Sequence, residues 1–187
     1  MSQQHIDRVR VTREAVICCA ILLSLTTIAL AQTTSSEKLE TSARHFVQSF
    51  YDWYAPVAVS ENKEPAWKIA IAKRNSFFDP HLRQALELDL AAQAKSPGQI
   101  VGLDFDPFLN SQDPDKKYKA AKVSAHGGRV LVDVYAVQRN TADKPAVIAE
   151  IEERSGSWVF VNFLYPDNGD LLAVLSRLRK YRDVPSK

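Results

Sequence analysis

The stretch that decides the fold is Tyr118–Val137, with the sequence YKAAKVSAHGGRVLVDVYAV. Apolar and polar residues alternate with a period of two on both sides of His126-Gly127-Gly128-Arg129. Two consecutive glycines tolerate the positive φ angles that a tight hairpin turn requires. We therefore predict a β-hairpin whose second strand has two unlike faces. Val130, Val132, Val134 and Ala136 form one face, and Leu131, Asp133, Tyr135 and Val137 form the other.

Two further strands follow this hairpin. Val147, Ala149 and Ile151 share one face of a predicted strand over Ala146–Glu153, and Ser155-Gly156 provides the next turn. The most apolar strand is expected over Trp158–Leu164. Because each connection is short, the sequence predicts a four-stranded antiparallel meander.

Helices are expected on both sides of the meander. Apolar residues at helical spacing predict a first helix over Glu37–Tyr54, which Pro56 should interrupt, and a short one over Trp67–Lys73. Asp79-Pro80 is typical of a helix start and Ser96-Pro97-Gly98 of a helix end, while Asp167–Asp170 should cap a C-terminal helix. Helices segregated from an antiparallel sheet indicate the α+β class. We expect N-terminal helices packed against a curved four-stranded meander, with a C-terminal helix.

The first 31 residues have the pattern of a secretory signal peptide. Arg8, Arg10 and Arg13 precede an uncharged run over Ala15–Ala31, which ends in a small-x-small sequence. We expect cleavage after Ala31, a single domain over residues 32–187, and a periplasmic or secreted location. The alternative is an uncleaved membrane anchor, although the run is short for a bilayer span. A lipoprotein is disfavoured because no small residue directly precedes Cys18 or Cys19.

Cleavage would remove both cysteines of the chain, Cys18 and Cys19. The remaining domain would have no disulfide, no cysteine metal site and no cysteine nucleophile. The formal net charge of the whole chain is only +2, which argues against a nucleic-acid partner. A membrane is expected as a partner only if the leader is retained.

Aromatic motifs give the chain a resemblance to a known superfamily. They are Phe50-Tyr51-Asp52-Trp53-Tyr54, Leu103-Asp104-Phe105-Asp106-Pro107-Phe108 with Gln112-Asp113, Trp158-Val159-Phe160 with Tyr165, and Asp170-Leu171-Leu172. With the element order, they resemble the nuclear transport factor 2-like (cystatin-like cone) superfamily, and more closely a secreted bacterial branch of unknown function. The resemblance implies a curved sheet wrapped around helices as a cone, and a homodimer through the sheet face as one use of that face. It does not imply one activity.

Asp89 is the first candidate for chemistry. On a helical wheel it falls among Leu82, Ala85, Leu86 and Leu90, so it should be buried and either hydrogen-bonded, paired or raised in pKa. In a cone it would be a weak candidate for a general acid or base, with Asp133 and Tyr135 sharing the interior. The alternative is a structural role, in which Asp89 caps a turn or meets an arginine.

The loop with Asp104, Asp106, Asn110, Asp113 and Asp115 concentrates oxygen ligands. Its spacing fails the twelve-residue calcium loop, so we expect no metal site and no cofactor. Asp106-Pro107 and Asp113-Pro114 are more typical of turns that fix a surface loop.

The remaining candidates would bind rather than react. The predicted ligand-binding residues are Trp53, Tyr54, Asp104, Asp106, Trp158 and Tyr165. The chain contains no Gly-x-Ser-x-Gly or Ser-x-x-Lys nucleophile motif. Our leading hypothesis is a non-catalytic binding domain for a small apolar ligand or a protein partner. The alternatives are an acid–base enzyme using Asp89 and a periplasmic inhibitor or immunity protein.

Overall fold

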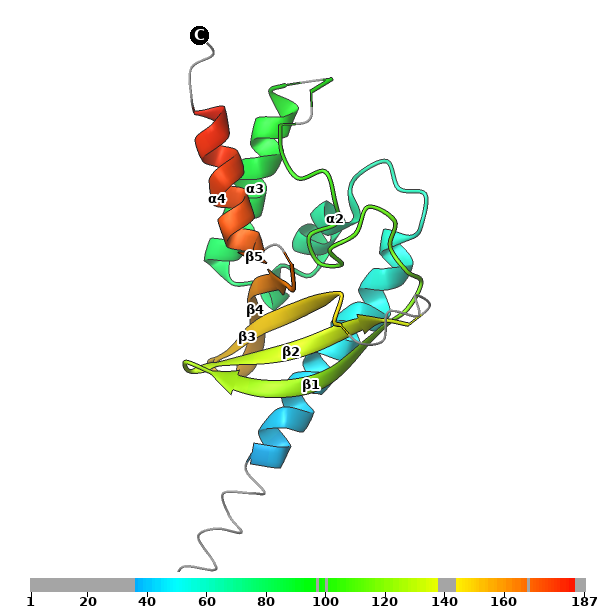
Figure 1. Cartoon of the computed structure of the whole chain (residues 1–187), viewed down its shortest axis with the longest axis vertical. Helices are drawn as coiled ribbons and strands as arrows, with labels where there is room; N and C mark the ends of the chain where they lie inside the picture. Colours follow the sequence, from blue (N-terminus) through cyan, green and yellow to red (C-terminus); the bar gives the residue numbers. More distant parts are fainter. Residues whose placement is uncertain (1–35, 97, 100, 138–143, 168, 184–187) are drawn as a thin grey trace, which may run out of the picture. The chain divides into compact units, whose positions relative to one another are not determined.

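The computed structural model describes residues 36–96, 98–99, 101–137, 144–167 and 169–183 (Figure 1). The chain divides into two compact units, Met1–Thr41 and Ser42–Lys187. In the first unit only residues 36–41 are described, and they are helical. The expected leader and its cleavage point lie outside the described residues. Within the described ranges, no helix is both long and apolar enough to cross a membrane.

The second unit begins with helices. Its residues 42–58 are helical, as are residues 36–41 of the first unit, so the first predicted helix is confirmed but continues beyond Tyr54. The expected interruption at Pro56 is wrong, because a proline in the last turn removes only one backbone donor and the helix ends at Ala58. Three short elements follow, namely α2 (Ala66–Lys73), η1 (Asn75–Phe77) and α3 (Pro80–Ala94).

The start of α3 is set by Asp79, as predicted. The Asp79 carboxylate accepts hydrogen bonds from the backbone N–H groups of His81, at 2.8 Å, and Leu82, at 3.3 Å. Its second oxygen pairs with Arg154, and its own backbone N–H donates to the carbonyl of Phe160 at 2.9 Å. These contacts fix the beginning of α3 to the sheet.

The sheet is an open antiparallel meander in the order β1-β2-β3-β4-β5. Its strands are β1 (Tyr118–His126), β2 (Arg129–Ala136), β3 (Val147–Arg154), β4 (Ser157–Tyr165) and the two-residue β5 (Gly169–Asp170). The hairpin turn is confirmed, with φ of 55° at Gly127 and 82° at Gly128. The fold class is α+β, with one short strand more than the four expected. The helix α4 (Leu171–Arg182) follows, and the Asp170 side chain caps it by accepting from the N–H of Ala173.

The N-terminal helix covers the exposed edge of β1. Gln48 forms two bonds with the strand backbone, accepting from the N–H of Ala120 at 2.8 Å and donating to the carbonyl of Tyr118 at 3.1 Å. Arg44 donates to the carbonyl of Ala121 at 2.8 Å. These side chains satisfy edge groups that would otherwise be a template for pairing with another chain.

Aromatic rings fill the space between this helix and the sheet. Phe50 lies 4.8 Å from Phe160 and 5.7 Å from Phe78, centroid to centroid, and Phe108 lies 4.8 Å from Phe163. All five rings are buried. Each contributes roughly 1.5–3 kcal/mol by burial. The interior between this helix and the sheet is therefore occupied by aromatic side chains.

Candidate functional site

The acidic loop, defined as residues 103–115, is held in place by three tyrosine hydroxyl groups. Tyr51 donates to the carbonyl of Phe108 at 2.8 Å, and Tyr165 donates to the carbonyl of Pro107 at 2.9 Å. Tyr54 donates to Oδ2 of Asp106 at 2.5 Å. The loop therefore has a fixed backbone at its apex, although it contains no helix or strand.

The three hydroxyl groups come from two elements of the fold. Tyr51 and Tyr54 are three residues apart on the N-terminal helix and so share its buried face, and Tyr165 ends β4. Burial, and then the nearby negative charge of Asp106, raises the pKa of all three phenols. They consequently remain protonated and able to donate.

Asp106 organises the loop from inside. Its Oδ1 accepts from the N–H of Phe108 at 3.0 Å, and its backbone N–H donates to the carbonyl of Ser111 at 2.9 Å. Burial raises the pKa of the Asp106 carboxyl to about 6, against the lowering effect of the Tyr54 hydroxyl and the backbone donors. Oδ1 closes an Asx turn within the loop, whereas Oδ2 accepts from Tyr54 on the N-terminal helix. This geometry gives Asp106 a structural role.

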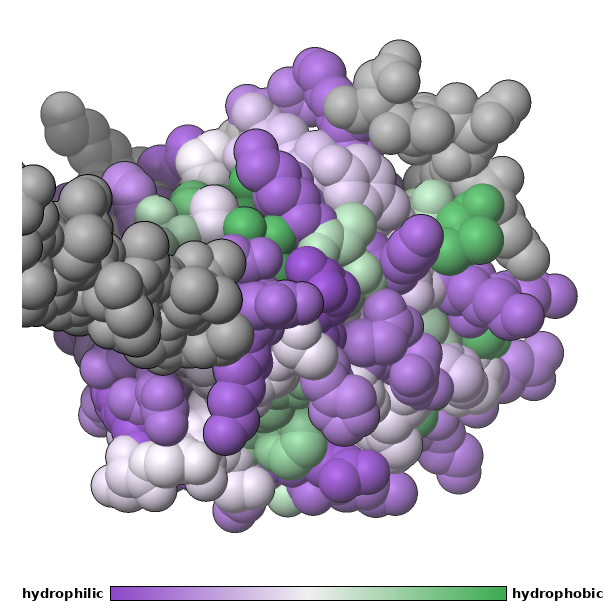
Figure 2. All heavy atoms as spheres, turned by 90° about the horizontal axis from the view of Figure 1, so that it is seen from below, coloured by the Kyte–Doolittle hydropathy of each residue, from purple (hydrophilic) through white to green (hydrophobic). Residues whose placement is uncertain are grey.

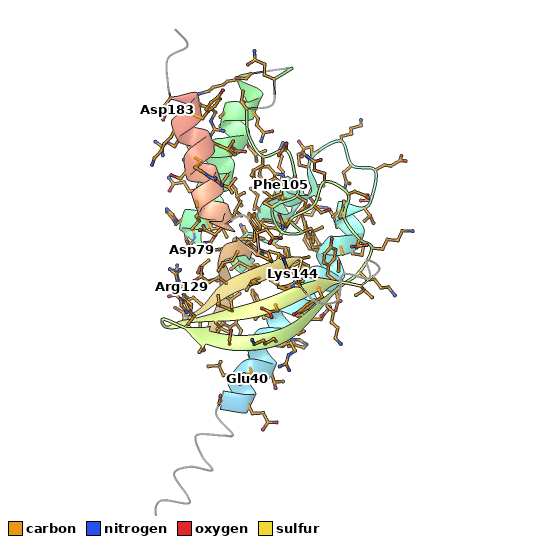
Figure 3. The ribbon with its side chains drawn as sticks, viewed as in Figure 1. Glu40, Asp79, Phe105, Arg129, Lys144 and Asp183 are labelled. Carbon is orange, nitrogen blue, oxygen red and sulfur yellow. The ribbon has the colours of Figure 1, made fainter. Side chains whose placement is uncertain are left out.

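A hollow of about 640 Å³ lies between the acidic loop and the start of α4. Its size is within the usual range of small-molecule sites. Phe105, labelled in Figure 3, belongs to the loop and lies edge-to-face against Tyr165, with centroids 5.7 Å apart. The lining residues are Asp104, Phe105, Asn110, Ser111 and Gln112 from the loop, Tyr165 and Asp167 around the end of β4, and Val174 and Arg177 from α4.

A smaller hollow, of about 300 Å³, lies against other parts of the same loop. Asp104, Phe105, Ser111 and Gln112 line both hollows. The remaining lining is largely apolar. It consists of Ala58, Pro65, Ala66, Trp67, Leu103, Asp106 and Pro114.

The predicted ligand-binding residues separate into two groups. Asp104 and Tyr165 line the larger hollow, and Asp106 lines the smaller one. Tyr54 lines neither, but its hydroxyl donates a hydrogen bond to Asp106. The two tryptophans lie elsewhere. The Trp53 ring lies under the guanidinium of Arg74, 5.0 Å from its centroid, and Trp158 donates to Ser42 Oγ at 3.0 Å. Neither tryptophan lines these hollows.

Asp89 is buried, with 1% of its surface exposed, and it meets an arginine. Its Oδ1 lies 2.6 Å from a guanidinium nitrogen of Arg182 at the end of α4. Its Oδ2 accepts from Gln93 at 2.8 Å and from the N–H of Leu103 at 3.0 Å. Asp89 thus has the burial and the arginine contact that the structural alternative expected, and it links the first residue of the acidic loop to α3 and α4.

The expectation that Asp133 and Tyr135 share the interior is wrong. Val132 and Val134 are fully buried on the core face of β2, so the alternating residues point away from the core. The Tyr135 hydroxyl is 3.5 Å from Oδ2 of Asp133, and burial and then the Asp133 charge raise the Tyr135 pKa. The contacts of Asp89 are with Gln93, Leu103 and Arg182 instead, so the three candidates form no common site.

Several lining residues were not predicted to bind a ligand, and Asn110 was considered only as an oxygen ligand for a metal. Asn110 has a φ of 51°, a left-handed conformation that asparagine tolerates, and its amide donates to the carbonyl of Ala146 at 3.1 Å. Val174 and Arg177 reach the hollow from α4. Nothing in the local sequence indicates that a helix after the last strand would lie beside this loop. In the described part of the chain, no group of three His, Cys, Asp or Glu side chains could hold a metal ion.

Comparison of the chain with family models, with curated proteins and with solved structures finds no match in any of the three.

Proposed function

We propose that this protein is a binding domain and that the two hollows beside the acidic loop form its binding surface. The observation that carries the proposal is the fixed loop between the hollows. Four of its residues line both of them, while three tyrosine hydroxyl groups and Asp106 hold its backbone. A preformed surface binds more tightly than a mobile one, because less conformational entropy is lost on binding.

The aromatic interior favours a site outside the core. An apolar ligand in the cone would have to displace rings such as Phe50, Phe108 and Phe160, which are at most 1% exposed. Binding at the acidic loop requires no such rearrangement. The sequence left the concave sheet face and the acidic loop open as binding locations, and the proposal keeps the binding role and chooses the loop.

The opposite face of the sheet offers less support for a partner. Arg129, labelled in Figure 3, lies 3.0 Å from Glu150 and 3.9 Å from Glu152. On the part of the face in Figure 2 that grey atoms do not cover, hydrophobic residues form separate spots among hydrophilic ones. Stable partner surfaces have a more continuous apolar centre. The proposed location of the binding domain is the periplasm or the exterior of the cell, on the basis of the leader pattern.

The test is a nuclear magnetic resonance screen of the ¹⁵N-labelled protein against a chemically mixed set of small molecules. We expect members of the set to shift the amide signals of Phe105, Asn110 and Gln112. Ser111→Trp places a large ring where the two hollows meet and should abolish these shifts. Ser124→Trp, at an exposed position of β1, is the matched control and should leave them unchanged.

Two outcomes would overturn the proposal. One is a screen in which no molecule shifts these three signals. The other is a set of shifts that survives Ser111→Trp while the signals of core residues show an intact fold. Gln112→Leu is a smaller change in the same lining and should weaken binding without filling the hollow.

A further inference from the structure

The chemistry of the larger hollow allows its ligand class to be specified. We propose that it binds a neutral, polyhydroxylated ligand, namely a saccharide. The inference rests on the binding role proposed above. It follows from the kinds of polar group that face the hollow and from their position around an aromatic wall.

The polar lining combines donors with acceptors. Asp104 and Asp167 offer carboxylate acceptors, and Arg177 offers a planar set of donors. Asn110 and Gln112 are amides that both donate and accept, and Asn110 is held in position by its bond to Ala146. Neighbouring hydroxyl groups of a sugar ring also donate and accept, so such planar side chains can engage them in pairs. Hydrogen bonds to the charged members are the stronger ones.

The aromatic wall suits the other surface of a sugar ring. Phe105 and Tyr165 both line the hollow and meet edge-to-face, but Tyr165 is only 4% exposed and its hydroxyl is committed to Pro107, so the half-buried Phe105 supplies most of the accessible aromatic surface. The face of an aromatic ring carries negative partial charge. The polarised C–H groups on the flat side of a pyranose are therefore attracted to it.

The same lining disfavours the other ligand classes. A fully apolar ligand would remove water from Asp104, Arg177 and the amides without replacing their hydrogen bonds, which is costly. An anion would face Asp104 and Asp167, of which Asp167 is paired with Lys144 at 3.4 Å, whereas a compact cation would face Arg177. A neutral molecule with many hydroxyl groups meets all of these side chains favourably.

The test is a titration of the ¹⁵N-labelled protein with cellobiose and with N,N′-diacetylchitobiose. Cyclohexanol, putrescine and sulfate are the apolar, cationic and anionic comparison probes. We expect the disaccharides to shift Asn110 and Gln112 at lower concentration than any comparison probe. Arg177→Met should weaken disaccharide binding about tenfold, as expected for loss of one charged hydrogen bond. Arg179→Met, two residues along the same helix and outside the lining, should have no effect.

The outcomes separate the ligand class from the binding role. If cyclohexanol, putrescine or sulfate shifts these signals and the disaccharides do not, the saccharide assignment is wrong while the binding surface stands. If none of the five probes shifts them, the saccharide assignment also fails, and the mixed screen decides the binding role. If Arg177→Met and Arg179→Met weakened disaccharide binding equally, Arg177 would act only through its general charge, and the proposed contact between Arg177 and the ligand would be wrong.

Discussion

The core and the acidic loop use aromatic side chains in different ways. In the core, Phe50, Phe78 and Phe160 pack on one another and present no polar atoms. At the loop, Tyr51, Tyr54 and Tyr165 have equally buried rings, but their hydroxyl groups reach out and hold the backbone. The rings thus supply stability, whereas the hydroxyl groups fix the shape of the surface. Mutations that remove only the ring or only the hydroxyl group should therefore affect stability and loop shape separately.

The largest effect is expected from loss of a core ring. Phe50→Ala removes a side chain that contacts rings from the helix, the loop and β4. The free energy of unfolding should fall by about 4 kcal/mol, because a cavity is left among rigid neighbours. Urea denaturation measures this change. Tyr181→Ala, at a position 83% exposed, is the control and should have almost no effect. A loss below about 1 kcal/mol for Phe50→Ala would mean that the core is not packed as described.

The next effect comes from the anchor at the start of the loop. Arg182→Met leaves the buried carboxylate of Asp89 without its cationic partner and should cost about 3 kcal/mol in unfolding free energy. The double variant Asp89→Asn/Arg182→Met should be less destabilised, because it buries no unpaired charge. A double-mutant cycle provides the check. If Arg182→Met were as stable as the native chain, the ion pair between Asp89 and Arg182 would not hold the loop.

Much of the core could be predicted from the sequence, because periodicity reports which face is buried. The alternation of Val130, Val132 and Val134 gave the core face of β2 correctly, and the helical wheel placed Asp89 inside. The partner of Asp89 could not be predicted, since Arg182 is 93 residues away and nothing local marks it. Long-range pairing depends on how elements pack.

The site was predicted only in part for the same reason. Asp104, Asp106 and Tyr165, which were predicted to bind a ligand, line the hollows of the candidate site. Carboxylates in a turn-rich loop and an aromatic residue at a strand end are local signals. Aromatic character alone could not distinguish Trp53 and Trp158, which lie elsewhere, from Tyr165. The role of the tyrosine hydroxyl groups depends on contacts 52–58 residues apart.

The loop, unlike the core, should respond to pH. Because the pKa of Asp106 is raised to about 6 from 3.8, the folded chain holds a proton between these values that the unfolded chain releases. Stability from this group should therefore rise as the pH falls from about 6 to about 4, by about 2–3 kcal/mol. Unfolding curves of the native chain and Asp106→Asn across this range isolate the effect. A constant stability difference between the two would contradict the assignment.

The smallest effect is expected from a single hydroxyl group. Tyr165→Phe keeps the buried ring and removes only the bond to Pro107, so the unfolding free energy should fall by about 1 kcal/mol. Loop amide signals should broaden more than those of β4. Ile151→Val, at a fully buried position of β3, is the comparison in the core and should alter packing without mobilising the loop. If the loop amide signals broadened equally in both variants, the hydroxyl group would have no specific role in fixing the loop.

The most direct measurement is hydrogen exchange at the backbone amides of Asp106 and Phe108. Both amides are donors inside the acidic loop, at 2.9 Å to Ser111 and 3.0 Å to the Asp106 carboxylate. If the hydroxyl groups make the loop a preformed surface, these amides should be protected to a degree approaching that of the β4 amides, and Tyr54→Phe should reduce their protection selectively. Exchange as fast as in an unstructured peptide would contradict a preformed binding surface.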